Sequence, residues 1–164
     1  PPRSTLFPYT TLFRSKKIIQ EKYKYFGEKE FDIDRREEEL ICLYMKQQTG
    51  SDFVFITEYP FQARPFYHML DEQGLTKSFD LLYQGVEITT GAQREHRIDV
   101  LKQQATMKGL GLEPIDFYLN FFRYGVPPHG GFGFGLTRFL MKFFQTETIR
   151  DVTFLYRGPN RVQP

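Results

Sequence analysis

Regularly spaced glycines precede an arginine in residues 125–138, GVPPHGGFGFGLTR. Glycines alternate with phenylalanines over residues 131–135, so on a strand the glycines would share one face and the phenylalanines would anchor the other face in the core. A face without side chains lets a flat ligand lie directly on the backbone. A helix starting near Leu136 would place Arg138 in its first turn, where the helix dipole does not favour a cation. The pattern suggests an external anion or π-system for Arg138; a tight turn with a solvated arginine is the alternative.

A second group of polar side chains lies in residues 86–94, VEITTGAQR. Glu87 falls in an otherwise apolar predicted strand, and a buried carboxylate is costly unless it is paired or holds a metal ion. Thr90 stands at the expected end of this strand, and Arg94 lies one turn into the expected next helix. Oxygen ligands of this kind suit magnesium, which usually keeps waters and phosphates as further ligands. A magnesium site and an internal Glu87–Arg94 ion pair both remain open.

Arg64 opens a third stretch, RPFYHM, which is a short strand candidate over residues 64–69. Taken alone, Arg64 is expected to be a surface arginine. The three histidines, His68, His96 and His129, have no metal-ligand spacing with one another, so we expect them to be structural. No Ser/His/Asp or Cys/His pattern of a nucleophilic enzyme stands out.

The elements that must position these residues alternate between helices and strands, which favours an α+β fold. Asp34 and Glu37 have the spacing of a capping box, and Gly85 divides a long extended stretch at a bend or a bulge. The pattern predicts helices over 32–50, 92–111, 113–125 and 136–146, strands over 52–60, 64–69, 78–91 and 151–156, and a turn at 71–74.

The composition is that of one globular domain: 164 residues, 40% hydrophobic and 26% charged. The net charge of +2 is too small to indicate nucleic-acid binding. Cys42 is the single cysteine, so an internal disulfide and a zinc site with two cysteines are excluded, and a reducing, cytosolic setting fits. No run of about 18 apolar residues predicts a membrane span.

Residues 1–15, PPRSTLFPYTTLFRS, show no helical or strand period that supports an element. They resemble translated sequencing-adapter DNA, with a disordered native tail as the alternative. We therefore expect a non-native or disordered segment at 1–15, a folded domain at 16–164, and a true upstream coding sequence that is missing.

Together, the three stretches resemble a known family. The residues FRYGVPPHGGFGFGLTRF are similar to motif 3 of the class II aminoacyl-tRNA synthetases. The stretches GVEITTGAQREHRIDVL and ARPFY…KSFDLLYQGVEI resemble the aspartyl-tRNA synthetases of the archaeal and eukaryotic type, over about Glu28 to Pro164. The resemblance implies an antiparallel sheet flanked by helices that binds ATP. It also implies a reaction in which aspartate attacks the α-phosphate of ATP and the aspartyl group then passes to tRNA.

The resemblance also implies roles for individual residues. Arg138 would pack on the adenine and reach the phosphates, Glu87 would hold Mg²⁺, and Arg94 would grip the side-chain carboxylate of aspartate. The close asparagine enzymes tend to have a small neutral residue at the place of Arg64, which favours aspartate as the substrate. The implied sets are catalytic Arg138 and Glu87; aspartate-binding Arg94, Thr90 and Arg64; ATP-binding Glu87, Gly133, Gly135, Leu136, Thr137 and Arg138; and magnesium ligands Glu87 and Thr90.

Two departures from the family pattern stand in this sequence. Thr137 takes the place of an acid that usually precedes the motif 3 arginine, and LYRGPNR replaces the usual FPRD. The anticodon-binding barrel and motifs 1 and 2 are expected upstream, so we expect the 164-residue chain not to be a competent synthetase by itself. The implied partners are L-aspartate, tRNA(Asp), with tRNA(Asn) left open, and a second subunit in a cytoplasmic homodimer with no membrane contact. An asparagine–tRNA ligase and a non-catalytic synthetase-like paralogue are the alternatives.

Overall fold

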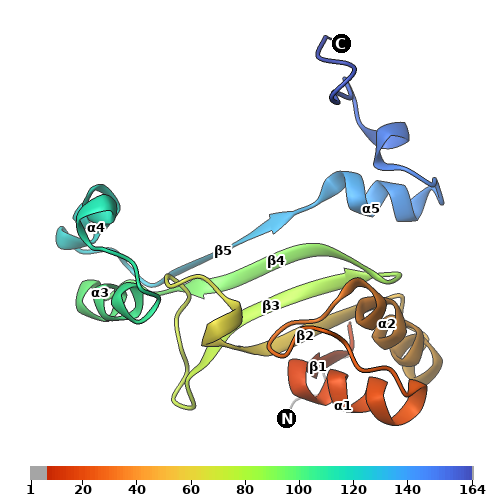
Figure 1. Ribbon diagram of the computed structural model, residues 1–164, viewed down its shortest axis with the longest axis horizontal. Coiled ribbons are helices and arrows are strands. Elements are labelled where there is room, and N and C mark those ends of the chain that lie inside the picture. Colours follow the sequence, from red (N-terminus) through yellow and green to blue (C-terminus); the bar gives the residue numbers. More distant parts are fainter. Residues whose placement is uncertain (1–6, 164) are drawn as a thin grey trace.

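The computed structural model describes residues 7–163, and this part of the chain forms a five-stranded sheet with helices beside it (Figure 1). β1 is parallel to β2, and the other neighbouring pairs are antiparallel. The expected α+β class is confirmed. Across the sheet the strands keep their chain order: β1 (Tyr9–Thr11), β2 (Phe53–Pro60), β3 (Leu75–Tyr83), β4 (Val86–Arg94) and β5 (His129–Phe134).

Two helices, α1 (Leu12–Tyr23) and α2 (Arg35–Thr49), pack beside β2 and β3 (Figure 1). The expected capping box is confirmed, because Asp34 accepts from the Glu37 amide and Glu37 accepts from the Asp34 amide. Gly50 ends α2 with a φ of 75°, a conformation that glycine adopts without strain. The main core lies between these helices and the strands and contains Leu12, Ile19, Ile41, Val54, Ile56 and Leu82.

The segment expected to lie outside the fold partly belongs to it. Residues 9–11 form β1, and Thr11 caps α1 by accepting a hydrogen bond from the Arg14 amide. Leu12 and Ser15 are completely buried, so their contribution to the core explains why this stretch is ordered despite its weak sequence period. Residues 1–6 of the same segment lie outside the described residues.

The long extended stretch that Gly85 divides is a β-hairpin rather than one bent strand. Gln84 and Gly85 have φ values of 48° and 80°, which fits the two-residue turn that matches the twist of paired strands. Further along, Leu81 faces Thr89 and Leu82 faces Glu87, so one residue of β4 is left without a partner. This β-bulge changes which side chains of β4 share a face.

The helix expected over 92–111 begins later, as α3 (Ile98–Met107). Residues 92–94 instead continue β4, because they pair with β5 from Gly131 to His129. The buried carboxylate of Glu95 then accepts hydrogen bonds from the His96 and Arg97 amides before the helix starts. The 3₁₀ turn Glu113–Ile115 and α4 (Asp116–Arg123) confirm the next helix, and α3 and α4 form a separate cluster at the far end of the long strands (Figure 1).

Two expected strands are absent from residues 7–163. Residues 64–69 make only one bridge, between His68 and Arg94, and residues 151–156 contain the end of the 3₁₀ turn Ile149–Val152 but no strand. Phe154 is 90% exposed, so the apolar pattern that predicted the second strand has no neighbouring strand to pack on within the described range. The helix expected over 136–146 is confirmed as α5 (Leu136–Phe143). No helix among residues 7–163 is long and apolar enough to cross a membrane.

Candidate active site

The sheet has two chemically different faces beyond its core. Asp80 of β3 lies directly opposite Thr90 of β4, which lies opposite Gly133 of β5. Directly opposed residues of antiparallel strands point to the same side, and alternate residues along a strand share it. Arg94, four residues after Thr90, therefore lies on the same side. We call this side the polar face and define it by Asp80, Thr90, Arg94 and Gly133.

The glycines of β5 leave the polar face open. A Cβ atom added at Gly131 or Gly133 would meet no heavy atom within 4 Å in the described part of the chain. The expected bare face is therefore present, but the expectation that the alternating phenylalanines anchor in the core is wrong. Phe132 and Phe134 point to the opposite side and are 70% and 48% exposed. Gly135 is not in the strand, because it is the residue that precedes α5.

Glu87 reaches the polar face because of the β-bulge. It faces Leu82, which lies two residues from Asp80 and so points to the same side as Asp80. Without the bulge, a residue three positions before Thr90 would point to the other side. The Glu87 side chain is 33% exposed, so the expected buried carboxylate is wrong.

Arg138 lies in the first turn of α5, as expected, and contacts Glu87 rather than solvent alone. Its Nη1 atom donates to the Glu87 main-chain oxygen at 3.0 Å and lies 3.3 Å from the Glu87 carboxylate. The internal ion pair foreseen for Glu87 thus exists, with Arg138 in place of Arg94. Both residues line a cavity of about 510 Å³, together with Arg35, Glu38, Val86, Met141, Glu147, Thr148 and Ile149.

Glu38 of α2 adds a second carboxyl group to this cavity. Burial, together with the negative charges of Glu87 and Asp80, raises the pKa of Glu38 to about 7. The hydrogen bond from the Glu87 amide and the positive charge of Arg138 act in the opposite direction. The sequence could not predict that Glu38 lies near Glu87, because α2 and β4 are far apart in the sequence and come together only in the folded chain.

Asp80 is a site residue that the sequence reasoning missed. It is 3% exposed, accepts a hydrogen bond from the Thr90 hydroxyl at 2.9 Å, and pairs with Arg64 at 2.5 Å. The Arg64 guanidinium also lies 3.7 Å from the centroid of the Tyr59 ring. Arg64 is therefore not the surface arginine that its isolated pattern suggested. The signal that could have found Asp80 is a carboxylate inside the apolar run SFDLLY, the same signal that singled out Glu87.

Arg94 is the last residue of β4 and not a helical residue, which corrects its expected place. Its guanidinium lies 4.7 Å from the centroid of the Tyr67 ring, and its Nη1 atom is buried without a hydrogen-bond partner among residues 7–163. The expected cluster of Glu87, Thr90 and Arg94 at one corner does not form. The three residues are instead spread along the polar face over roughly 20 Å, at about 3.3 Å per residue.

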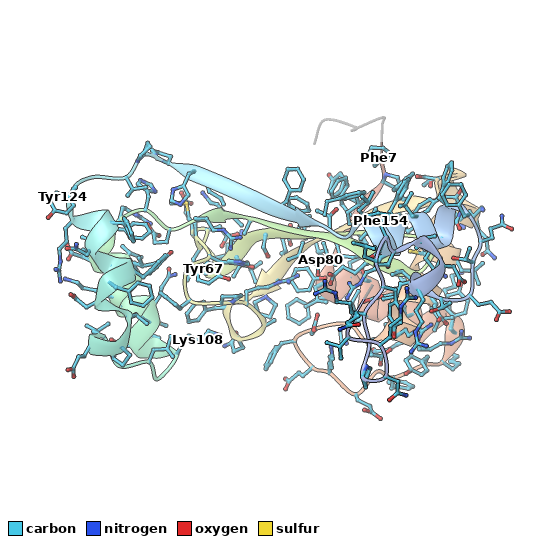
Figure 2. All side chains as sticks on the ribbon, turned by 90° about the horizontal axis from the view of Figure 1, so that it is seen from above. Phe7, Tyr67, Asp80, Lys108, Tyr124 and Phe154 are labelled. Carbon is cyan, nitrogen blue, oxygen red and sulfur yellow. The ribbon has the colours of Figure 1, made fainter. Side chains whose placement is uncertain are left out.

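The segment that carries Arg64 is held by buried hydrogen bonds. Gln104 of α3 is 2% exposed and donates to the main-chain oxygens of Phe66 and His68. The Glu95 amide donates to the Tyr67 oxygen at 2.9 Å. These contacts take the place of the regular hydrogen bonds of a strand and fix the side chains near Arg94. Tyr67 and Asp80 both lie between the two helical ends of the molecule (Figure 2). Gln104 was not singled out, because its partners lie 36 and 38 residues away.

His68 is a buried histidine beside Arg94. It is 3% exposed, and burial together with the charges of Arg94 and Arg64 lowers its pKa to about 4. The imidazole is therefore neutral at physiological pH. Its unfolded-state pKa is near 6.5, so the unfolded chain binds more protons than the folded chain between about pH 4 and 6.5, and stability must fall as the pH is lowered through this window.

On acidification from pH 7 to pH 4, we expect the wild-type chain to lose more stability than the His68→Leu variant loses. The shift corresponds to about 3 kcal/mol between pH 7 and pH 4, and the raised pKa of Glu38, present in both proteins, cancels in the comparison. Urea unfolding of both proteins at the two pH values measures this difference. An equal loss of stability in the two proteins would show that His68 does not carry a depressed pKa.

Comparisons with known proteins agree with this arrangement. Residues 8–157 match the family described as tRNA synthetases class II (D, K and N). The chain is 46% identical over 159 residues to the aspartate–tRNA(Asp/Asn) ligase of Aeropyrum pernix, covering 96% of this chain and 36% of that protein. It is 43% identical over 162 residues to the aspartate–tRNA(Asp) ligase of Pyrococcus horikoshii, with the same coverage of each. The chain thus spans about a third of the length of these curated relatives.

Solved structures show the same fold. An aspartyl-tRNA synthetase from Entamoeba histolytica superposes with a TM-score of 0.88 at 30% identity, over 97% of this chain and 33% of that chain. An asparaginyl-tRNA synthetase from Pyrococcus horikoshii gives a TM-score of 0.82 at 27% identity, over 100% of this chain and 38% of that one. With the family match covering nearly the whole chain, this protein belongs to the class II tRNA synthetases of the D, K and N group.

Proposed function

We propose that this chain forms part of the active site of an aspartate–tRNA ligase, which activates L-aspartate with ATP and transfers it to tRNA(Asp). The observation that carries the proposal is the buried Nη1 atom of Arg94, which has no hydrogen-bond partner in the described chain. A buried guanidinium donor without a partner is costly, and a carboxylate that accepts two hydrogen bonds from it removes that cost. The curated relatives are aspartate–tRNA ligases, and the aspartate side chain is such a carboxylate.

The charge of the pocket favours aspartate over asparagine. Arg64 and Arg94 are positive, Asp80 is paired with Arg64, and His68 is neutral, so the pocket carries one positive charge in excess. A side-chain carboxylate balances this charge, whereas the neutral amide of asparagine leaves it unpaired. The resemblance suggested that both Arg64 and Arg94 would be free to bind the substrate carboxylate. Because Arg64 pairs with Asp80, only the charge of Arg94 is left for the substrate.

The remaining residues of the polar face suit ATP, the substrate that class II synthetases use. The bare backbone at Gly133 offers a flat surface for the adenine and ribose, and Arg138 lies at the start of α5 beside it. Gly135 directly precedes α5, and Leu136 and Thr137 are the first two residues of that helix. All three would border the same ligand. Thr90 lies between Arg94 and Glu87 on this face. We propose that the reacting carboxylate and the α-phosphate meet near Thr90, in the middle of the face.

Glu87 fits the role of a magnesium ligand. Its carboxylate is partly exposed and borders the cavity with Arg138, and the Thr90 hydroxyl donates to Asp80 and keeps its lone pairs for another partner. These are oxygen donors, which Mg²⁺ prefers, and one or two carboxylates are its usual protein share. When bound, the ion would neutralise phosphate charge. Among residues 7–163 no three histidine, cysteine or acidic side chains converge as a metal cage.

The reaction needs alignment and charge stabilisation more than a protein nucleophile. An oxygen of the aspartate α-carboxylate bonds to the α-phosphorus, the bond from that phosphorus to the bridging oxygen breaks, and pyrophosphate leaves with its electron pair. Arg94 would fix one end of aspartate, and Arg138 would hold the nucleotide, so the reacting atoms meet in one orientation. The positive charge of Arg138 would also stabilise charge that develops on the phosphates. A cytoplasmic homodimer that charges tRNA(Asp), and in some settings tRNA(Asn), completes the proposal for the whole protein.

An asparagine–tRNA ligase is the second candidate, because the asparaginyl-tRNA synthetase structures share the fold and Asp80 neutralises Arg64. Isothermal titration with aspartyl-sulfamoyl adenosine and its asparaginyl counterpart separates the two. We expect tighter binding of the aspartyl compound. Tighter binding of the asparaginyl compound would favour the second candidate, and failure of the chain to bind either would contradict both and favour a non-catalytic paralogue.

A further inference from the structure

His68 and Arg94 are direct neighbours across an isolated antiparallel bridge. Residues in this relation have Cβ atoms about 4.5–5.5 Å apart and point to the same side. Arg94 points to the polar face, so the His68 ring stands beside the Arg94 guanidinium on that face. The rings of His68 and Tyr67 are in edge contact, with centroids 5.3 Å apart, and Tyr67 in turn lies under Arg94.

The His68 ring has a buried nitrogen without a partner. Its Nδ1 atom is inaccessible to solvent and makes no hydrogen bond within residues 7–163, and the same is true of the Arg94 Nη1 and Arg64 Nε atoms. The positive charges of both arginines act on the ring, which places all three side chains in one neighbourhood. Three unsatisfied buried nitrogen groups, two of them guanidinium donors, are unusual in a folded chain and point to an absent acceptor.

The backbone of His68 does not need the ring to hold its position. The His68 amide donates to the Pro65 oxygen at 3.2 Å, and the His68 oxygen accepts from Gln104 at 2.9 Å. If position 68 served only for packing, an apolar residue would make the fold more stable than histidine does, because an unpaired buried nitrogen costs about 1–3 kcal/mol. His129, the other histidine that flanks Arg94, differs in this respect, since its Nδ1 atom contacts the Pro127 oxygen at 3.0 Å.

We propose that His68 is a specificity-determining residue of the aspartate pocket, whose ring N–H donates a hydrogen bond to the substrate side-chain carboxylate beside Arg94. This inference rests on the proposed aspartate site. The ring supplies a donor without adding a positive charge, because its lowered pKa keeps it neutral. The pocket therefore keeps a single excess positive charge. The carboxylate would gain a hydrogen bond from His68 in addition to the two from Arg94. If this inference is right, the expectation that all three histidines are structural fails for His68.

The test compares three forms of the chain, the wild type, His68→Leu and His68→Asn, by isothermal titration with aspartyl-sulfamoyl adenosine and its asparaginyl counterpart. Leucine fills a similar volume without a donor, whereas the asparagine amide can place an N–H near the position of Nδ1. Loss of a hydrogen bond to a charged acceptor is expected to weaken aspartyl binding of His68→Leu by at least about tenfold. We expect His68→Asn to stay within about threefold of the wild type, and the asparaginyl compound to lose less than the aspartyl compound.

Thermal unfolding of each variant shows whether it is folded. If folded His68→Leu binds the aspartyl compound as tightly as the wild type, the inference is wrong while the proposed function stands. If both variants lose affinity equally for both compounds, His68 acts through packing, and the inference is also wrong. If the wild type itself binds neither compound, it is the proposed function that fails.

Discussion

Replacement of Arg94 by alanine is expected to weaken binding of aspartyl-sulfamoyl adenosine by at least about a hundredfold, because it removes a charge-assisted, two-bond contact to a buried carboxylate. The free chain is expected to lose little thermal stability, since the Arg94 Nη1 atom has no hydrogen-bond partner in the described structure and only the contact with the Tyr67 ring is removed. Arg94→Lys should not restore binding, because an ammonium group lacks the planar fork that matches a carboxylate. Calorimetric titration and thermal unfolding of the same samples measure both effects.

Arg123→Ala is the matched control for this prediction. Arg123 is a half-exposed arginine at the end of α4 that pairs with Asp116, away from the polar face. Its loss removes the same charge from the chain and should leave binding unchanged. If Arg94→Ala bound the analogue as Arg123→Ala does, the pocket assigned to Arg94 would be wrong.

Gly133→Val is expected to weaken nucleotide binding without harming the fold. A side chain at this position meets open space, so the core is not disturbed, and valine is a better strand residue than glycine. The added methyl groups would occupy the surface on which the nucleotide is proposed to lie, and overpacking of this kind costs about 1–3 kcal/mol. We therefore expect at least about a fivefold loss of affinity for magnesium AMP-PNP, measured by titration, with an unchanged or slightly higher melting temperature.

Gly91→Ala should give the opposite result. A Cβ atom at Gly91 would collide with the Phe79 ring on the side away from the polar face. This variant should lose stability, while the part that remains folded binds the nucleotide normally. If Gly133→Val bound AMP-PNP as tightly as the wild type, the bare face would serve only for packing, and the nucleotide would have to bind elsewhere.

Local features of the fold were predictable from the sequence. The ends of α2 were predicted well because the capping box and Gly50 act through residues only a few positions apart. The glycine alternation of β5 and the position of Arg138 at the start of α5 were predicted for the same reason. These patterns are decided by neighbouring residues, so one sequence is enough to see them.

Long-range pairing decided the features that were missed. The residues around Arg94 are typical of a helix. Arg94 nevertheless lies on a strand, because β4 pairs with β5, which begins 35 positions after Arg94. The β-bulge after Glu87 depends on the register with β3, and without it Glu87 would point away from Thr90. Asp80 gained its importance only when Arg64 and Thr90 came to lie on either side of it.

A crystal structure of the chain with aspartyl-sulfamoyl adenosine tests the central claim most directly. We predict that the analogue lies along the polar face, with its side-chain carboxylate on Arg94 and within hydrogen-bond distance of His68. Its adenine would rest against the backbone at Gly133, beside Arg138. An analogue bound in the opposite direction, or on another surface with Arg94 still unpaired, would contradict the account.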